Sequence, residues 1–218
     1  MPSRTARWTP AEPEAPDHQD QLLVDFAVEA PQNHDVHAER LRVSSLPDLE
    51  LVRVRVDRVD AAMGSLPGAR VRDVHFAAGD LSNIVVTDAS VRRVRAHGLG
   101  AVGIDISGSR LEDVRLVNCK LRPGRGLGVS MTRCVFEDCD LREADLEGAL
   151  LDRVVFRGCD LSSARLSGVD LSRCDLRGSN VDGLVVSPDR LRGVLVDPSQ
   201  LPTFASALGL RVQAVPAR

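Results

Sequence analysis

A five-residue period runs from Ser44 to Val181 and restricts the fold more than any other feature of the sequence. Between these residues lie 40 Lys, Arg, Asp and Glu side chains, and none occupies either of two positions of the five-residue unit. Those two positions, separated by two residues, hold apolar or small side chains. Neither a 3.6-residue helical period nor simple strand alternation gives this pattern. The five-residue unit must therefore be the structural unit, with the two positions directed inward.

Individual units share the order small apolar, polar, large apolar, polar, polar. Examples are 139–143 (CDLRE), 144–148 (ADLEG), 159–163 (CDLSS) and 174–178 (CDLRG). Over about two thirds of its length the sequence resembles the pentapeptide repeat family, whose consensus is A(D/N)LXX. The first half departs from the consensus, because valine often stands where Ala or Cys is usual. We therefore expect wider or less regular coils there.

The resemblance implies an all-β fold, a right-handed quadrilateral parallel β-helix in which four units make one coil of about twenty residues. A single unit with two small inward side chains cannot form a hydrophobic core. Stacked units bury a continuous apolar column, as such a fold requires. Coils stacked about 4.8 Å apart also pair their backbone groups along the axis. The repeat is long enough for roughly seven coils.

Stacking at twenty residues places like side chains above one another in the core. Three thiols form one such column, and two phenylalanines and two leucines form others. We interpret the thiol column as inert packing, since a straight column does not offer tetrahedral metal geometry. The predicted core residues are Cys119, Cys139, Cys159, Phe136, Phe156, Leu141 and Leu161.

Composition divides the chain into four segments. We expect a disordered, Pro-rich tail over 1–20, an N-terminal cap over 21–40, the repeat over 41–185 and a helical C-terminal cap over 186–218. A helix from about Pro198 to Leu208 should close the rod with one apolar side. That side consists of Leu201, Phe204, Ala205 and Leu208.

Glycines at both inward positions of 123–128 mark one weak stretch of the repeat, which is either an in-line coil or a loop. Because the period resumes in the same phase after this stretch, we favour a thinned, in-line coil.

Several functional classes are disfavoured by composition. The net charge is −3, and no apolar run is long enough to span a bilayer. We expect a cytoplasmic protein that binds neither membranes nor nucleic acid directly. The histidines are scattered, and a rod with convex faces offers no pocket in which a carboxylate could be activated. We therefore expect no enzyme activity, no catalytic or metal residues and no cofactor.

Surface charge carries the remaining information. Residues 51–135 hold fourteen basic and eight acidic groups, whereas 136–182 hold six basic and eleven acidic groups. Our main hypothesis is a rigid protein-interaction module with an unknown partner, either a monomer or a homodimer through the C-terminal helix. The candidate contacts are Asp140, Asp145, Glu147, Asp160, Asp170 and Asp175.

The alternative comes from the family, some members of which mimic DNA and bind DNA gyrase or topoisomerase IV, inhibiting the enzyme or protecting it from quinolone-type poisons. A mimic needs acidic charge along most of its length, because the phosphate field is what the enzyme recognises. Only the last part of this repeat is acidic, so DNA mimicry remains the second hypothesis.

Overall fold

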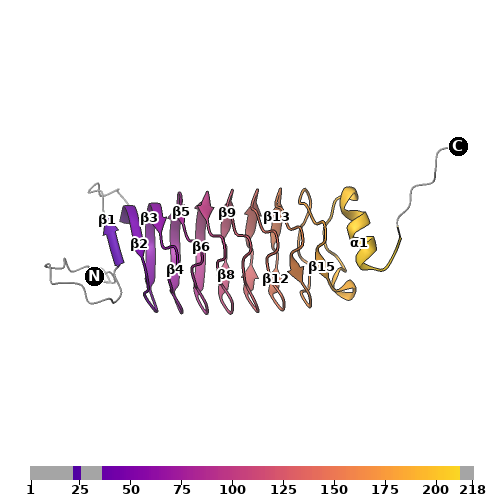
Figure 1. The fold of residues 1–218 in the computed structure, drawn as a ribbon, viewed down its shortest axis with the longest axis horizontal. Coiled ribbons are helices and arrows are strands. Elements are labelled where there is room, and N and C mark those ends of the chain that lie inside the picture. The colour runs from indigo at the N-terminus through magenta and orange to yellow at the C-terminus, as the bar shows by residue number, and fades with distance from the viewer. Residues whose placement is uncertain (1–21, 26–35, 212–218) are drawn as a thin grey trace.

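Parallel strands form a right-handed quadrilateral β-solenoid of about 7 turns, with a single short helix near the C-terminus (Figure 1). This computed structural model describes residues 22–25 and 36–211. The fold class implied by the resemblance to the pentapeptide repeat family is confirmed. The expected tail over 1–20 lies outside the described residues. No helix in the described ranges is long and apolar enough to cross a membrane.

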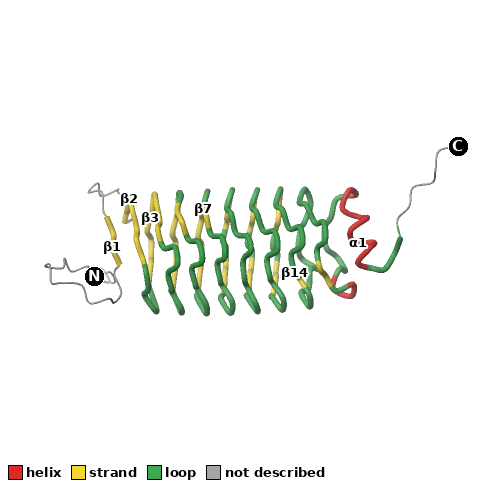
Figure 2. The backbone as a smooth tube through the Cα atoms, viewed as in Figure 1, coloured by secondary structure: helices red, strands yellow, loops and turns green. Residues whose placement is uncertain are grey.

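Short strands alternate with turns all along the rod (Figure 2). In chain order the strands are β1 (Leu22–Asp25), β2 (Val36–Val43), β3 (Glu50–Asp60), β4 (Arg70–Phe76), β5 (Gly79–Asp80), β6 (Ser90–His97), β7 (Leu99–Gly100), β8 (Arg110–Glu112), β9 (Arg115–Val117), β10 (Ser130–Thr132), β11 (Val135–Glu137), β12 (Leu150–Asp152), β13 (Val155–Arg157), β14 (Arg165–Leu166) and β15 (Val185–Val186).

Parallel pairing joins residues that are twenty apart on all four sides of a coil. Four successive units each pair with the unit one coil later. The pairs are Ser130 with Leu150, Val135 with Val155, Asp140 with Asp160, and Asp145 with Arg165. Every side of the coil therefore belongs to a parallel ladder, as the twenty-residue stacking predicts.

The N-terminal end follows a different register. β2 pairs with β3 at a spacing of eighteen residues, for example Arg42 with Asp60, whereas Ser45 already pairs with Ser65 at the regular spacing. The change falls where the five-residue period begins. β1 pairs antiparallel with β2 and occupies that edge of the sheet. Such pairing covers a strand that would otherwise expose its backbone groups.

The inward columns form one continuous core. The rings of Phe136 and Phe156 stack with centroids 5.0 Å apart. All seven predicted core residues are at most 5% exposed. An apolar cavity of about 190 Å³ lies mainly among first-half residues such as Val59, Val94 and Ile104. Packing is therefore looser where valine replaces the smaller consensus residue.

The glycine-containing stretch 123–128 stays in line with the rod. Arg125 pairs with Asp105 on one side and Asp145 on the other, and the next coil begins without an excursion. The prediction of a thinned, in-line coil is confirmed, and no loop leaves the rod at this point.

The C-terminal end is closed by a buried glutamine. Parallel pairing continues past residue 185, because Asp175 pairs with Leu195. After η1 (Pro188–Arg190), η2 (Pro198–Gln200) leads into α1 (Leu201–Ala207). The Gln200 side-chain amide donates to the carbonyls of Leu176 and Ser179, at 2.7 Å each. The Leu176 carbonyl also accepts from the backbone N–H of Ser179, so the Gln200 amide adds a second bond there and supplies the Ser179 carbonyl with a donor.

The predicted apolar side of the helix is largely wrong. Phe204 is buried, but Leu201 and Leu208 are 54% and 52% exposed, and Ala205 is half-buried. Gln200 anchors the start of the helix against the last coil. Most of the leucine surface then faces outward, and α1 covers the end of the rod with Phe204.

A substitution pair tests the inward assignment. Cys139→Arg should abolish cooperative unfolding, because Cys139 is 2% exposed and a buried unpaired charge is strongly destabilising. Asp138→Arg should change the free energy of unfolding by less than about 0.5 kcal/mol. Asp138 is exposed with φ 52°, a conformation that Arg133 and Arg153 also adopt. Urea unfolding checks both variants, and equal tolerance of the two would contradict the assignment.

Candidate protein-interaction surface

The six candidate acidic residues do not gather into one patch. Asp140 and Asp160 lie in one column, where they are direct register partners. Asp145 and Glu147 belong to the next unit and therefore to the next side of the coil, Asp170 lies on the third side and Asp175 on the fourth. The acidic charge of this segment is thus distributed around the rod. A partner in contact with one side would reach at most two of these positions per coil.

Most of these aspartates have a structural role that the sequence analysis missed. The carboxylate at the second position of the unit accepts a hydrogen bond from the backbone N–H two residues later. Ser162 donates to Asp160 at 3.0 Å, and Ser172 donates to Asp170 at 2.9 Å. Such bonds satisfy turn N–H groups that the ladder leaves unpaired. The same bond occurs at Asp80, Asp105, Asp140, Asp145, Asp175 and Asn180.

The recurrence of Asp or Asn at this position was the available signal for this role. Asparagine and aspartate both offer a side-chain oxygen to the turn, so the repeat selects the oxygen and not the charge.

Arginines neutralise three of the candidate carboxylates within the chain. Arg142 binds Asp140 through two nitrogens, at 2.8 and 2.6 Å, and holds the pKa of that carboxyl below its ordinary value of 3.8. Arg177 does the same for Asp175. Arg165 lies 3.1 Å from Glu147.

The remaining candidates differ in how their charge is offset. Arg142 is 3.7 Å from Asp160. Asp145 and Asp170 have no ion pair within the described part of the chain. These two retain the most charge for a partner.

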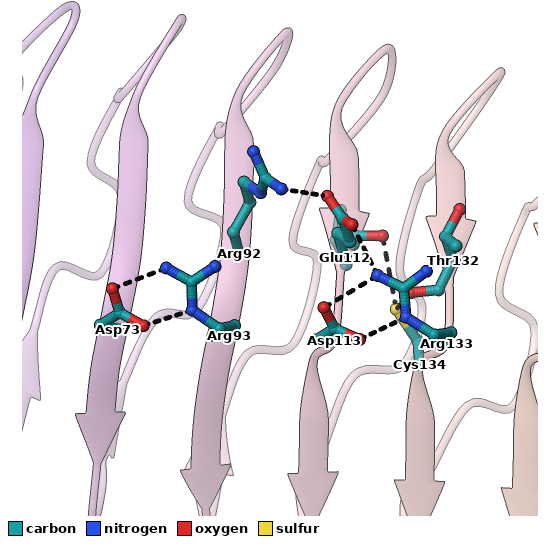
Figure 3. Close-up of polar contacts among 9 residues, drawn as sticks. Asp73, Arg92, Arg93, Glu112, Asp113, Thr132, Arg133 and Cys134 are labelled. Atoms are coloured by element: carbon teal, nitrogen blue, oxygen red, sulfur yellow. Dashed lines mark hydrogen bonds and ion pairs between the residues drawn. The ribbon is translucent and has the colours of Figure 1, made fainter.

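A second column carries alternating charge and neutralises itself. Arg93 binds Asp73 at 2.5 and 2.8 Å, and Arg133 binds Asp113 at 2.6 and 2.9 Å (Figure 3). Both guanidinium groups hold the pKa of their aspartate below its ordinary value. Opposite charges directly across neighbouring strands stabilise a sheet. The charges of these residues are therefore compensated within the chain, and no bound ligand is needed to account for them.

Glu112 links that column to its neighbour. It lies 2.9 Å from Arg92 and 2.5 Å from Arg133, and the sequence spacing alone did not reveal the second pair (Figure 3). Arg92 and Glu112 are register partners in one column, whereas the pair of Glu112 with Arg133 crosses between columns and depends on side-chain conformations.

The thiols are all free and buried. Burial raises the pKa of Cys134 and Cys174 to about 11, which keeps both as neutral thiols. In residues 22–25 and 36–211, no group of three or more His, Cys, Asp or Glu side chains is arranged to hold a metal ion. The chemistry that this surface offers is therefore charge and hydrogen bonding.

One of the candidates borders a groove. Asp175 lines an open hollow of about 250 Å³ together with Arg157, Arg177 and Asp197. The hollow carries both signs of charge, and Asp197 also accepts a hydrogen bond from the backbone N–H of Gly178. It is part of the contact between the repeat and its C-terminal closure.

Comparison with known proteins identifies the repeat. The model of the family described as pentapeptide repeats matches residues 128–158 and 139–178, with eight copies. No curated protein matches the sequence significantly.

A comparison with two solved structures finds a shared fold in one of them. A trypsin-treated variant of QnrB1, a plasmid-mediated fluoroquinolone resistance protein, superposes with a TM-score of 0.54 at 17% identity, over 81% of this chain and 99% of that one. HetL, a pentapeptide repeat protein involved in heterocyst differentiation regulation in the cyanobacterium Nostoc, gives a TM-score of 0.25 at 16% identity, over 71% and 87% of the chains. The likeness to the QnrB1 variant is one of fold.

Two substitutions at Asp160 distinguish the role of its hydrogen bond to the turn from the role of its charge. Asp160→Ala should lower the free energy of unfolding by about 1 kcal/mol, because the Ser162 N–H loses its acceptor. Asp160→Asn keeps an acceptor oxygen and should stay within about 0.5 kcal/mol of the original chain. Denaturant midpoints measure both, and equal destabilisation by Asn and Ala would contradict the turn role.

Acid sensitivity tests the arginine pairs. Because the folded pKa of Asp140 is lowered, its contribution to stability is present above the unfolded pKa and is lost as pH falls through the folded pKa. Arg142→Gln should therefore lower the urea midpoint at about pH 7 and reduce the further loss between about pH 4 and pH 2.

The matched control for this acid test is Arg110→Gln. Arg110 is an exposed arginine with no ion pair among the described residues. An acid response in Arg142→Gln identical to that of the control would contradict the pairing.

Proposed function

We propose that this chain, in which residues 128–158 and 139–178 match the model of the family described as pentapeptide repeats, is a rigid protein-interaction module of the cytoplasm and not an enzyme. The observation that carries the proposal is the closed core. Inward positions are filled by apolar side chains, so chemistry is confined to exposed side chains held at fixed spacing by the ladders. A stiff, regular surface suits recognition of another protein, because little order is lost on binding.

The proposed contact is the acidic segment 136–182, with Asp145 and Asp170 at its most available positions. Neither carboxylate has an ion pair among the described residues, and both are held in place by a turn hydrogen bond. Charge fixed on a rigid backbone favours steering and orientation of a basic partner.

The second candidate is a DNA mimic that binds DNA gyrase or topoisomerase IV, with inhibition or protection from quinolone-type poisons as the outcome. The fold shared with the QnrB1 variant, whose name records fluoroquinolone resistance, supports this alternative. The excess of basic groups over 51–135 weakens it, because it interrupts the acidic field that a mimic needs.

For the oligomeric state, a monomer and a homodimer through α1 are both compatible with the C-terminal surface. Leu201, Leu208 and Leu210 are 54%, 52% and 59% exposed. A second copy docked on α1 would remove this apolar surface from water.

A gyrase supercoiling assay, with and without a fluoroquinolone, separates the two functions. If the chain is a DNA mimic, micromolar protein should inhibit supercoiling or protect it from the drug. The double variant Asp145→Asn, Asp160→Asn should weaken that effect about tenfold, since charge-assisted contacts are worth about 1.5 kcal/mol or more. Asn keeps both turn hydrogen bonds, so the fold is preserved.

The chain supplies a matched control in the same two columns. Asp80 and Asp105 make the same turn bonds but lie before the acidic segment. The double variant Asp80→Asn, Asp105→Asn should therefore leave activity unchanged. If the original protein has no effect on gyrase, the DNA-mimic hypothesis is wrong and the interaction module has another partner. If both double variants lose activity equally, the contact lies outside the acidic segment.

A further inference from the structure

Four basic side chains lie one above another on a single side of the rod. Arg55 pairs in register with His75, His75 with Arg95, and Arg95 with Arg115. Neighbouring members are therefore separated by one strand spacing, about 4.8 Å at the backbone. We refer to these four residues as the basic column.

The basic column breaks a rule that the adjacent column follows. Like charges directly opposite on neighbouring strands destabilise a sheet. Over residues 73–133, the part of the rod that also carries the basic column, the adjacent column avoids this by alternating Asp73 with Arg93 and Asp113 with Arg133 (Figure 3). Arg153 and Arg173 continue that column without alternation. In the basic column, Arg95 and Arg115 face each other as like charges, whereas the pKa of His75 lies below 6.5 and its ring is neutral at pH 7. The charge of Arg95 therefore calls for another source of negative charge.

Carboxylates within the chain reach only the two ends of the basic column. Arg55 is 3.7 Å from Asp57, and Arg115 is 2.6 Å from Glu137. Arg95, at the centre, is exposed and has no ion pair with any described residue. The middle of the basic column is thus an uncompensated positive surface.

The pKa of His75 reflects its partial burial and the positive charges of the arginines around it. Its pKa lies below the ordinary value of 6.5, first because the ring is partly buried and then because Arg55 and Arg95 lie on either side, and His97 adds to the effect. Asp57 is the carboxylate that opposes the shift. An anion placed over this ring would reverse the shift.

The shape and charge of the surroundings restrict the anion. Guanidinium groups in a row match carboxylates or phosphates equally well. However, the next side of the coil carries Asp60 and Asp80, and the whole chain has a net charge of −3. A duplex lying along the rod would bring phosphates within about 10 Å of those carboxylates, where repulsion is not screened. A ligand narrow enough to contact only the basic column would avoid this repulsion.

Large aromatic side chains that could stack on bases are absent from the basic column, in which His75 is the one ring. The sequence contains no Tyr and a single Trp, Trp8, which lies outside the described residues. Single-stranded nucleic acids depend on such stacking in addition to charge, so an acidic polypeptide fits better than either nucleic acid.

We propose that the basic column is a docking strip for an extended acidic segment of a partner protein, aligned with the rod axis. The inference rests on the proposed role as a protein-interaction module and adds a second surface, separate from residues 136–182. An extended chain rises about 3.3 Å per residue, so about five residues span the strip. Carboxylates on alternate residues would face Arg55, Arg95 and Arg115 in turn.

Fluorescence anisotropy with a labelled peptide of about ten glutamates tests the strip on the full chain at low ionic strength. Binding should saturate below about 1 mM, and Arg95→Gln should weaken it about tenfold. Arg95 points outward, so this variant retains the core. Lys120→Gln removes another exposed cation without an ion pair from a different side of the coil and should leave the affinity unchanged.

Three results would overturn the proposal. The first is no saturation below about 1 mM. The second is equal loss of affinity in the Arg95 and Lys120 variants. The third is tighter binding of single-stranded or duplex DNA of matched charge than of the peptide.

Proton NMR of His75 locates the bound peptide. The peptide should raise the pKa of His75, because carboxylates placed beside the ring favour its charged form. An unchanged titration of His75 with bound peptide would place the peptide elsewhere and contradict the proposal.

The acidic-segment variant separates the two surfaces. Asp145→Asn, Asp160→Asn should bind the glutamate peptide as tightly as the original chain, because both positions lie on other sides of the rod. If the peptide does not bind, the proposal for the basic column is wrong and the proposal for the acidic segment 136–182 is unaffected. If the protein has no effect in the gyrase assay, the proposal for the basic column is unaffected. A weakening of peptide binding in this double variant would contradict the assignment to the basic column.

Discussion

Backbone hydrogen bonding between coils that are twenty residues apart is the interaction on which the rest of the structure depends. It sets the strand spacing, closes each side of the coil into a ladder and forces every fifth residue into the same environment. Because the core is then only two side chains deep per unit, it tolerates valine, cysteine, alanine and leucine but no charge. The same ladders fix the spacing of every outward side chain.

That fixed spacing turns the surface into parallel columns whose chemistry is set by charge order. Where Asp and Arg alternate, as at Asp73 and Arg93, the column neutralises itself. Where Asp occupies the second position of the unit, one of its carboxylate oxygens accepts a hydrogen bond from the turn and is less available to a binding partner. The basic column from Arg55 to Arg115 satisfies neither condition, and it is therefore the surface that most needs an external ligand.

The sequence period was sufficient to predict the inward positions and the in-line passage through 123–128, because one inward residue fixes all its equivalents. The twenty-residue coil and its ladders followed from the resemblance to the pentapeptide repeat family. The turn role of Asp160 could have been found from the recurrence of Asp and Asn. Val186, Leu191, Val194 and Val196 keep the period beyond residue 185, which signals the continued pairing to Leu195. The pair of Glu112 with Arg133 and the outward Leu201 were not predictable, since they depend on side-chain conformations and on the contact of Gln200 with the last coil.

Scalar couplings across hydrogen bonds, measured by NMR between amide nitrogens and carbonyl carbons, test the stacking most directly. The amide of Leu121 donates to the carbonyl of Asp140, Leu141 to Asp160, and Leu161 to Asn180, each at 2.8 Å. The account predicts a coupling for each of these pairs, from a residue to the one nineteen positions later. Couplings of these three amides to carbonyls at any other separation, or no coupling from any of them, would contradict the twenty-residue coil and the assignment of inward and outward columns with it.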